Sequence, residues 1–190
     1  KKQVADAKKY RGNEFTEING YVKSVWSDLL CFPVGKIAGK PEDNVVFENS
    51  WMQSRTFGGD RGHEGTDIMA SENVRGIYPV YSMTDGVVEN IGWLRLGGYR
   101  IGIRSPSGAY FYYAHLASYE KYFQTGEAVE AGQILGFMGD TGYGEEGMSG
   151  KFPVHLHLGI YINPQGKEEL SVNPYYVLQA MEKKVKKYTY

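Results

Sequence analysis

Short runs of β-branched and aromatic residues, separated by glycine-rich turns, fill the chain from Phe32 to about Val172. The runs 98–106 and 109–116 flank a Ser-Gly pair, a combination typical of a β-hairpin. The stretch 127–142 adds further short apolar pieces that glycines divide. This pattern predicts a mainly β fold built from antiparallel hairpins.

The two ends of the chain differ from this part in composition and pattern. Residues 1–31 are charged and poor in glycine, which predicts a helical or irregular lead-in. Residues 172–188 predict a terminal helix entered through Pro174, because proline is favoured in a first helical turn. We therefore expect a lead-in over 1–31, one domain over 32–178, and a helix end with a basic tail over 179–190.

Composition limits the possible classes of protein. The chain has 190 residues, of which 42% are hydrophobic and 23% charged, as in an ordinary globular domain. The formal net charge is -1 and no basic patch stands out, which argues against a nucleic-acid partner. The single cysteine, Cys31, cannot form an internal disulfide, and we expect it to be a small buried apolar residue.

No stretch of the sequence is apolar and long enough to span a bilayer, and no signal peptide is visible. The chain begins with Lys1 rather than methionine. We expect it to be a processed or trimmed fragment, with any signal or membrane anchor upstream.

The four histidines carry the chemical signal, and two of them, His155 and His157, form a His-x-His pair. The surrounding residues are β-branched and apolar, so the pair is predicted to lie on a strand, where residues two apart face the same side. The leucines on either side of His157 then enter the core. Two neighbouring imidazoles on one face are costly unless a metal or a polar site accounts for them.

His63 and Asp67 form a His-x-x-x-Asp pair. The glycines at 62 and 65 disfavour a helix, so a loop that leads into a strand near Asp67 is expected. Imidazole nitrogens and carboxylate oxygens are zinc ligands, and a catalytic zinc site uses three protein ligands. Taking His63, Asp67 and one member of the His-x-His pair leaves two histidines for proton transfer, and spacing does not decide which ones.

Two other interpretations of His-x-His fit less well. A cupin-type metal site needs a glutamate soon after the pair, and the next acid is Glu168. A lipoyl or biotinyl carrier needs a lysine at a hairpin tip, and 129–142 contains none.

An ordered series of segments resembles the lysostaphin/LytM-type peptidoglycan endopeptidases. The segments are FPVG, RTFGGDRGHEGTDIMA, YRIGIRSPSGAYFYYAHL, VEAGQILGFMGDTG, VHLHLGI and SVNPYYVL, which together run from Phe32 to about Leu178. The resemblance implies an antiparallel β-sheet groove with an N-terminal lead-in and a short C-terminal helix. It also implies hydrolysis of peptide bonds in bacterial peptidoglycan, with an extracytoplasmic location.

The resemblance assigns roles to the site residues. His63, Asp67 and His157 would hold one Zn²⁺ per chain, and His115 and His155 would be the unliganded catalytic pair. A catalytically silent, zinc-binding scaffold or partner-binding domain of the same fold remains the alternative. A peptidase whose substrate is a protein rather than the cell wall is a less favoured hypothesis.

The segment 143–153 departs from the resemblance. It is longer than the usual link before the His-x-His strand and acidic in its middle. We expect this loop to border the groove, as a lid, as a specificity wall, or as a harmless insertion. The sequence leaves the cleaved bond and the oligomeric state open.

Overall fold

The computed structural model describes residues 2–37, 45–164 and 168–188, and its architecture is mainly antiparallel β, as predicted. The three α-helices of these residues are α1 (Lys2–Tyr10), α2 (Gly12–Trp26) and α3 (Tyr175–Met181). The strands are β1 (Lys36–Ile37), β2 (Val46–Phe47), β3 (Ser54–Arg55), β4 (Arg61–Gly62), β5 (Thr66–Met69), β6 (Pro79–Tyr81), β7 (Gly86–Leu94), β8 (Gly98–Arg104), β9 (Tyr110–Tyr119), β10 (Ala128–Val129), β11 (Ile134–Met138), β12 (His155–Ile162), β13 (Leu170–Val172) and β14 (Lys187–Tyr188).

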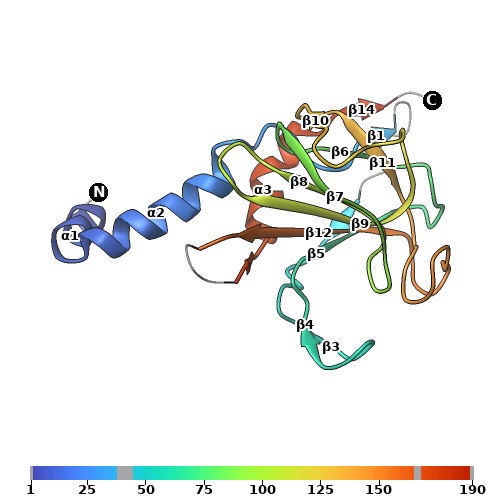
Figure 1. Cartoon of the computed structure of the whole chain (residues 1–190), viewed down its shortest axis with the longest axis horizontal. Coiled ribbons are helices and arrows are strands. Elements are labelled where there is room, and N and C mark those ends of the chain that lie inside the picture. The colour runs from blue at the N-terminus through green and yellow to red at the C-terminus, as the bar shows by residue number, and fades with distance from the viewer. Residues whose placement is uncertain (1, 38–44, 165–167, 189–190) are drawn as a thin grey trace.

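One large sheet organises the molecule (Figure 1). Its main path runs β10-β7-β8-β9-β12-β5-β2, and each neighbouring pair is antiparallel. Strand β11 joins β6 to β9, and β13 adds to β12. The predicted hairpin of β8 and β9 is confirmed, with Ile103 opposite Phe111. The β3–β4 hairpin forms a separate small sheet that projects from the body.

Strand alternation separates the core from the groove. On β12, Leu156 and Leu158 are fully buried in the core, while His155 and His157 lie on the opposite face. On β9, Tyr113 is buried and its hydroxyl accepts a hydrogen bond from the backbone N–H of Met83. The expected division of the His-x-His strand into an aliphatic and an imidazole face is therefore confirmed.

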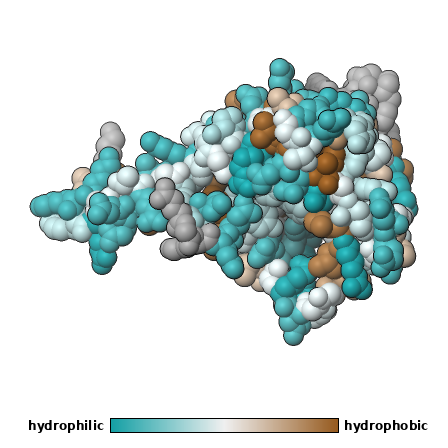
Figure 2. Space-filling model, viewed as in Figure 1, coloured by the Kyte–Doolittle hydropathy of each residue, from teal (hydrophilic) through white to brown (hydrophobic). Residues whose placement is uncertain are grey.

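The lead-in is helical and projects as an arm. Figure 2 shows α1 and α2 extending from the body with a mostly hydrophilic surface. No residue of α1 is buried, and α2 buries only Val25. Val25 and the following Leu29 join the hydrophobic core of the β-domain. None of the helices in the described ranges is long and apolar enough to cross a membrane.

The predicted helix over 172–188 is wrong in its second half. Helix α3 ends at Met181 and a 3₁₀ turn follows over Glu182–Lys184. The chain then becomes extended, and β14 pairs in parallel with β1. Val185, partly buried, packs against the core, and this contact together with strand pairing outweighs helix propensity in a short lysine-rich segment.

The sequence places Cys31 in the core, and the structure agrees. Cys31 is buried and its thiol donates a hydrogen bond to the carbonyl of Ser82 at 2.9 Å. Burial raises the pKa of this thiol to about 11, despite the nearby Lys186.

Removing residues 1–19 should leave the β-domain intact. Residues 2–19, the described part of this segment, contribute no buried side chain, so we expect the melting temperature to change by less than about 2 °C. As a control, Leu29→Ala in the full chain removes a core side chain and should lower it by roughly 5 °C or more. Differential scanning calorimetry checks both. A large fall in the melting temperature of the truncated chain would mean that the arm stabilises the domain.

Candidate metal centre and groove

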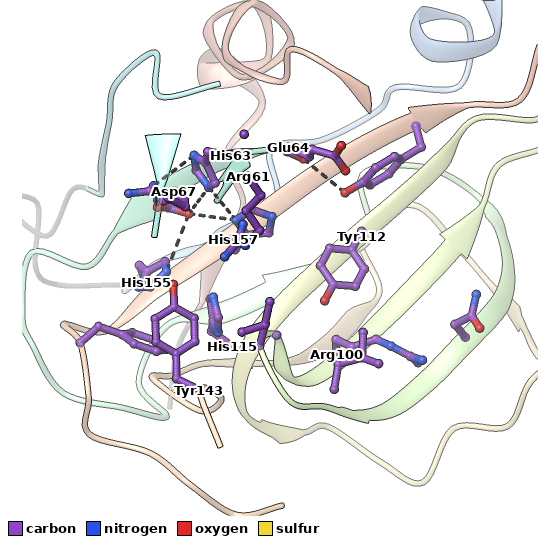
Figure 3. A pocket seen from close by; sticks show the side chains of 18 of the residues that line it. Arg61, His63, Glu64, Asp67, Arg100, Tyr112, His115, Tyr143, His155 and His157 are labelled. Atoms are coloured by element: carbon purple, nitrogen blue, oxygen red, sulfur yellow. Dashed lines mark hydrogen bonds and ion pairs between the residues drawn. The ribbon is translucent and has the colours of Figure 1, made fainter. Parts of the chain in front are cut away.

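Three predicted residues, His63, Asp67 and His157, meet at one end of a groove. Strands β5 and β12 pair so that Asp67 lies directly opposite His157. His63 comes from the segment between β4 and β5. Figure 3 shows the three side chains turned toward one another.

The ligand atoms form a nearly equilateral triangle. His63 Nε2 lies 3.1 Å from Asp67 Oδ1 and 2.9 Å from His157 Nδ1. His157 Nδ1 lies 3.0 Å from the same carboxylate oxygen. A tetrahedral zinc with bonds of about 2.0–2.2 Å separates its ligand atoms by roughly 3.3–3.6 Å. An ion therefore fits this donor set once the three atoms move apart by a few tenths of an ångström.

Neighbouring groups orient two of these donors. His63 Nδ1 lies 3.0 Å from the carbonyl oxygen of Ser50, which can only accept, so Nδ1 carries the hydrogen and Nε2 is free for a metal. Arg55 Nη2 lies 2.8 Å from Asp67 Oδ2 and 3.1 Å from His63 Nδ1. Because Nδ1 of His63 donates a hydrogen bond here, it cannot accept one, and Arg55 donates its hydrogen to the Asp67 carboxylate. Arg55 thus occupies Oδ2 and leaves Oδ1 to face the metal position.

The pKa values favour metal-binding protonation states. Burial alone would raise the pKa of Asp67, but its close polar contacts with the imidazoles of His157 and His63 outweigh burial and hold the pKa well below its usual range. Burial lowers the pKa of His157 more than its contacts with Asp67 raise it. The carboxylate is therefore ionised and the imidazole neutral near neutral pH, as metal coordination requires.

A backbone irregularity brings His115 into the groove. Regular alternation on β9 would place His115 on the core side with Tyr113. Between Tyr113 and Leu116, however, β9 has one residue more than its partner β8, which is a β-bulge. His115 has φ of 63°, a left-handed conformation that is strained for a residue with a Cβ atom. Its N–H donates to the carbonyl of Gly97 at 2.8 Å, which helps to hold the bulge.

His115 and His155 present the same nitrogen to the groove. The Nδ1 atom of His115 donates to the carbonyl of Thr141 at 2.7 Å, and that of His155 donates to the carbonyl of Pro153 at 2.8 Å. Both histidines therefore keep Nε2 for other partners. Their ring centroids are 4.7 Å apart. Burial lowers the pKa of His115, and the neighbouring imidazoles of His155 and His157 lower it further, so its neutral form dominates near neutral pH.

The groove has a volume of about 790 Å³. The expectation that loop 143–153 borders it is met at both loop ends, because Tyr143, Phe152 and Pro153 line the groove. The Tyr143 ring stacks on Phe57 at 4.2 Å between centroids, and Phe152 packs edge-on against His115. The lid function of this loop stays a prediction.

The five predicted site residues thus gather in one groove, and the sequence analysis missed their supporting groups. Arg55 lies in a segment with no regular pattern, and nothing in its spacing links it to Asp67. The carbonyls of Ser50 and Thr141 act through the backbone, which leaves no side-chain signal. Arg55 and Thr141 both lie in segments that the resemblance covers, and this was the available hint.

A family model described as peptidase family M23 matches residues 61–174, more than half of the chain. The chain belongs to peptidase family M23. The matched region contains all five site residues.

Relatives and solved structures of this M23 domain agree on the fold. The L-Ala--D-Glu endopeptidase of Bacillus subtilis is 47% identical over 137 residues, which are 72% of this chain and 40% of that protein. A structure from Ruminococcus gnavus, described as a candidate glycyl-glycine endopeptidase lytM, is 51% identical with a TM-score of 0.86, covering 97% of this chain and 73% of that one. The catalytic domain of lysostaphin from Staphylococcus simulans is 26% identical with a TM-score of 0.55, covering 71% and 92%. The chain thus spans less than half the length of the curated B. subtilis relative.

The absence of a side chain at Gly65 should be essential for metal affinity in this M23 domain. A Cβ atom there would lie 2.5 Å from His157 Cε1 and 2.6 Å from the carbonyl oxygen of Leu158. Gly65→Ala must displace the His157 ring, and we expect zinc affinity to fall by roughly 10- to 100-fold. Competition with a chromophoric chelator measures this. Gly20→Ala, where a Cβ meets nothing within 4 Å, is the matched control and should bind zinc like the wild type. Equal affinity in the two variants would contradict the packing argument.

Proposed function

We propose that this chain is a zinc-dependent endopeptidase that hydrolyses peptide bonds in bacterial peptidoglycan. His63, Asp67 and His157 would hold one zinc ion, and His115 and His155 would be the catalytic residues. The observation that carries the proposal is the triangle of three ligand atoms with two further imidazoles beside it. Family membership supports the hydrolytic class.

The bound ion would supply Lewis acidity toward a peptide carbonyl and lower the pKa of a coordinated water toward about 7. Everything else in the chemistry falls to the side chains of this chain. Arg55 donates a hydrogen bond to Oδ2 of Asp67 and so leaves Oδ1 turned toward the ion. The half-enclosed groove limits bulk water around the ligands, which strengthens each electrostatic contact.

His115 and His155 are suited to move protons. Each has its Nδ1 hydrogen fixed on a backbone carbonyl, so Nε2 is the atom that accepts or delivers a proton. One would take a proton from the attacking water, and the other would stabilise the developing oxyanion or protonate the leaving amine. Their similar environments leave both assignments open.

The substrate would be a peptide of the cell wall. Relatives named an L-Ala--D-Glu endopeptidase and a glycyl-glycine endopeptidase support peptidoglycan as the polymer. The two bonds in these names differ in chemistry, because glutamate retains a free carboxylate and glycine has no side chain. An extracytoplasmic location follows from such a substrate.

A catalytically silent, zinc-binding domain is the second candidate. The stacked rings of Phe57 and Tyr143 come from two different loops, and Tyr143 also contacts His115 edge-on. This arrangement narrows access to the catalytic pair. If these loops do not separate in solution, the domain would bind metal without turning over cell wall.

Two variants distinguish metal binding from catalysis. His115→Ala should keep about one zinc per chain and lose muropeptide release by ~10²–10⁴-fold, because it removes a proton-transfer group and no ligand. His157→Ala should lose both zinc and activity, since it removes a ligand. Metal content by plasma emission and fragment release from purified cell wall measure the two properties. A wild type that binds zinc but cleaves no cell wall would support the silent domain, and one that binds no zinc would contradict both candidates.

A further inference from the structure

Two arginines on β8 have opposite electrostatic surroundings. Arg104 forms a bidentate pair with Glu89, both contacts at 2.6 Å, and a third contact with Glu169 at 2.8 Å. Arg100 also lines the groove but has no ion pair among the described residues. Its Nη1 atom is buried without a hydrogen-bond partner in this part of the chain.

The missing counter-ion is not supplied by the neighbouring acids. Glu169 lines the same groove, and Arg104 already binds it together with Glu89. The charge of Arg100 acts on three tyrosines, Tyr110, Tyr112 and Tyr119. Burial raises the pKa of the Tyr112 phenol, and the positive charge of Arg100 partly offsets this rise, which places the guanidinium close to the ring. Figure 3 likewise shows Arg100 beside Tyr112 and apart from the metal-ligand cluster. A guanidinium nitrogen that is buried without a hydrogen-bond partner is unfavourable, and an anionic acceptor would satisfy both this nitrogen and the unpaired charge of Arg100.

The position of Arg100 relates it to the reacting bond. Residues Tyr99 and Ile101 pair with β9 on either side of the bulge that carries His115. On the other edge of β9, Ala114 pairs with the metal ligand His157. The backbones of Arg100 and His157 therefore lie at the same level across the sheet. They are two strands apart, which is about 10 Å between Cα atoms at the usual strand spacing.

We propose that Arg100 binds a free carboxylate of the peptide substrate within about three residues of the scissile bond. The assignment rests on the proposed function and deepens it, because it names the class of peptide. The planar guanidinium suits a carboxylate, which can accept two parallel hydrogen bonds from it. The chain then selects acidic stem peptides and discriminates against uncharged bridges such as polyglycine.

The test uses two synthetic stem peptides that are identical except that every free carboxylate of the first is a carboxamide in the second. The wild-type, zinc-loaded chain should cleave the acidic peptide with kcat/KM about 10- to 100-fold higher than the amidated peptide. Arg100→Gln should reduce this ratio to below about 3 by lowering kcat/KM for the acidic peptide alone. Arg100→Lys keeps the charge but not the bidentate geometry and should give an intermediate ratio.

Arg95→Gln is the matched control. Arg95 is exposed, does not line the groove, and its replacement changes the net charge by the same amount. This variant should keep the wild-type ratio. An unchanged ratio in Arg100→Gln, or an equal loss on both peptides, would overturn the proposal, because the second result indicates a structural role.

A binding measurement separates this inference from the proposed activity. Zinc-loaded His115→Ala should bind the acidic peptide about 10-fold or more tightly than the amidated one in calorimetry, and the double variant with Arg100→Gln should bind the two equally. If the wild type cleaves neither peptide nor cell wall but this preference is present, endopeptidase activity fails and the carboxylate site stands. If cleavage occurs without any preference in rate or binding, the carboxylate site fails and the activity stands.

Discussion

The pairing register of β5, β12 and β9 is the constraint on which the site depends. It places Asp67 opposite His157 and His157 opposite Ala114 in one row across the sheet. Because side chains alternate along a strand, a slip of one residue would turn both histidines of β12 into the core and its leucines into the groove. The buried Leu156 and Leu158 oppose such a slip. The metal-binding geometry is thus stabilised by the aliphatic face on the other side of the same strand.

The site combines this regular part with two irregular ones. His63 comes from a segment outside the large sheet, tied down by a hydrogen bond to Ser50, and His115 comes from a bulge with left-handed backbone. Bulges and strained backbone cost free energy of order 1–3 kcal/mol and persist where surrounding contacts hold them. Here the Gly97 and Thr141 carbonyls bind the backbone and ring of His115, respectively. Regular pairing fixes the position of the proposed metal site, and local hydrogen bonds orient the rings of the proposed catalytic pair beside it.

The regular parts of the site are the ones that the sequence predicts, and the irregular parts are the ones that it does not. The mainly β class, the strand at His155 and His157 and the loop leading to Asp67 follow from hydrophobic periodicity and glycine placement. The bulge at His115 does not, because nothing in the aromatic run around it marks an extra residue, which appears only in the pairing with β8. The role of Arg55 depends on the fold of a hairpin outside the large sheet. The last helix was predicted too long because Val185 packs against the core, a tertiary contact that sequence periodicity cannot distinguish from a helical one.

The charged side chains of the groove are arranged so that an anionic peptide would bind in one orientation. At the metal end, Arg55 neutralises one oxygen of Asp67, so the two charges compensate each other. On β8, Arg104 compensates Glu89 and Glu169. Arg100 has no ion pair in the described part of the groove. A peptide with an anionic group on one side of its reacting bond would therefore bind in one orientation, since the reverse orientation leaves the guanidinium unpaired.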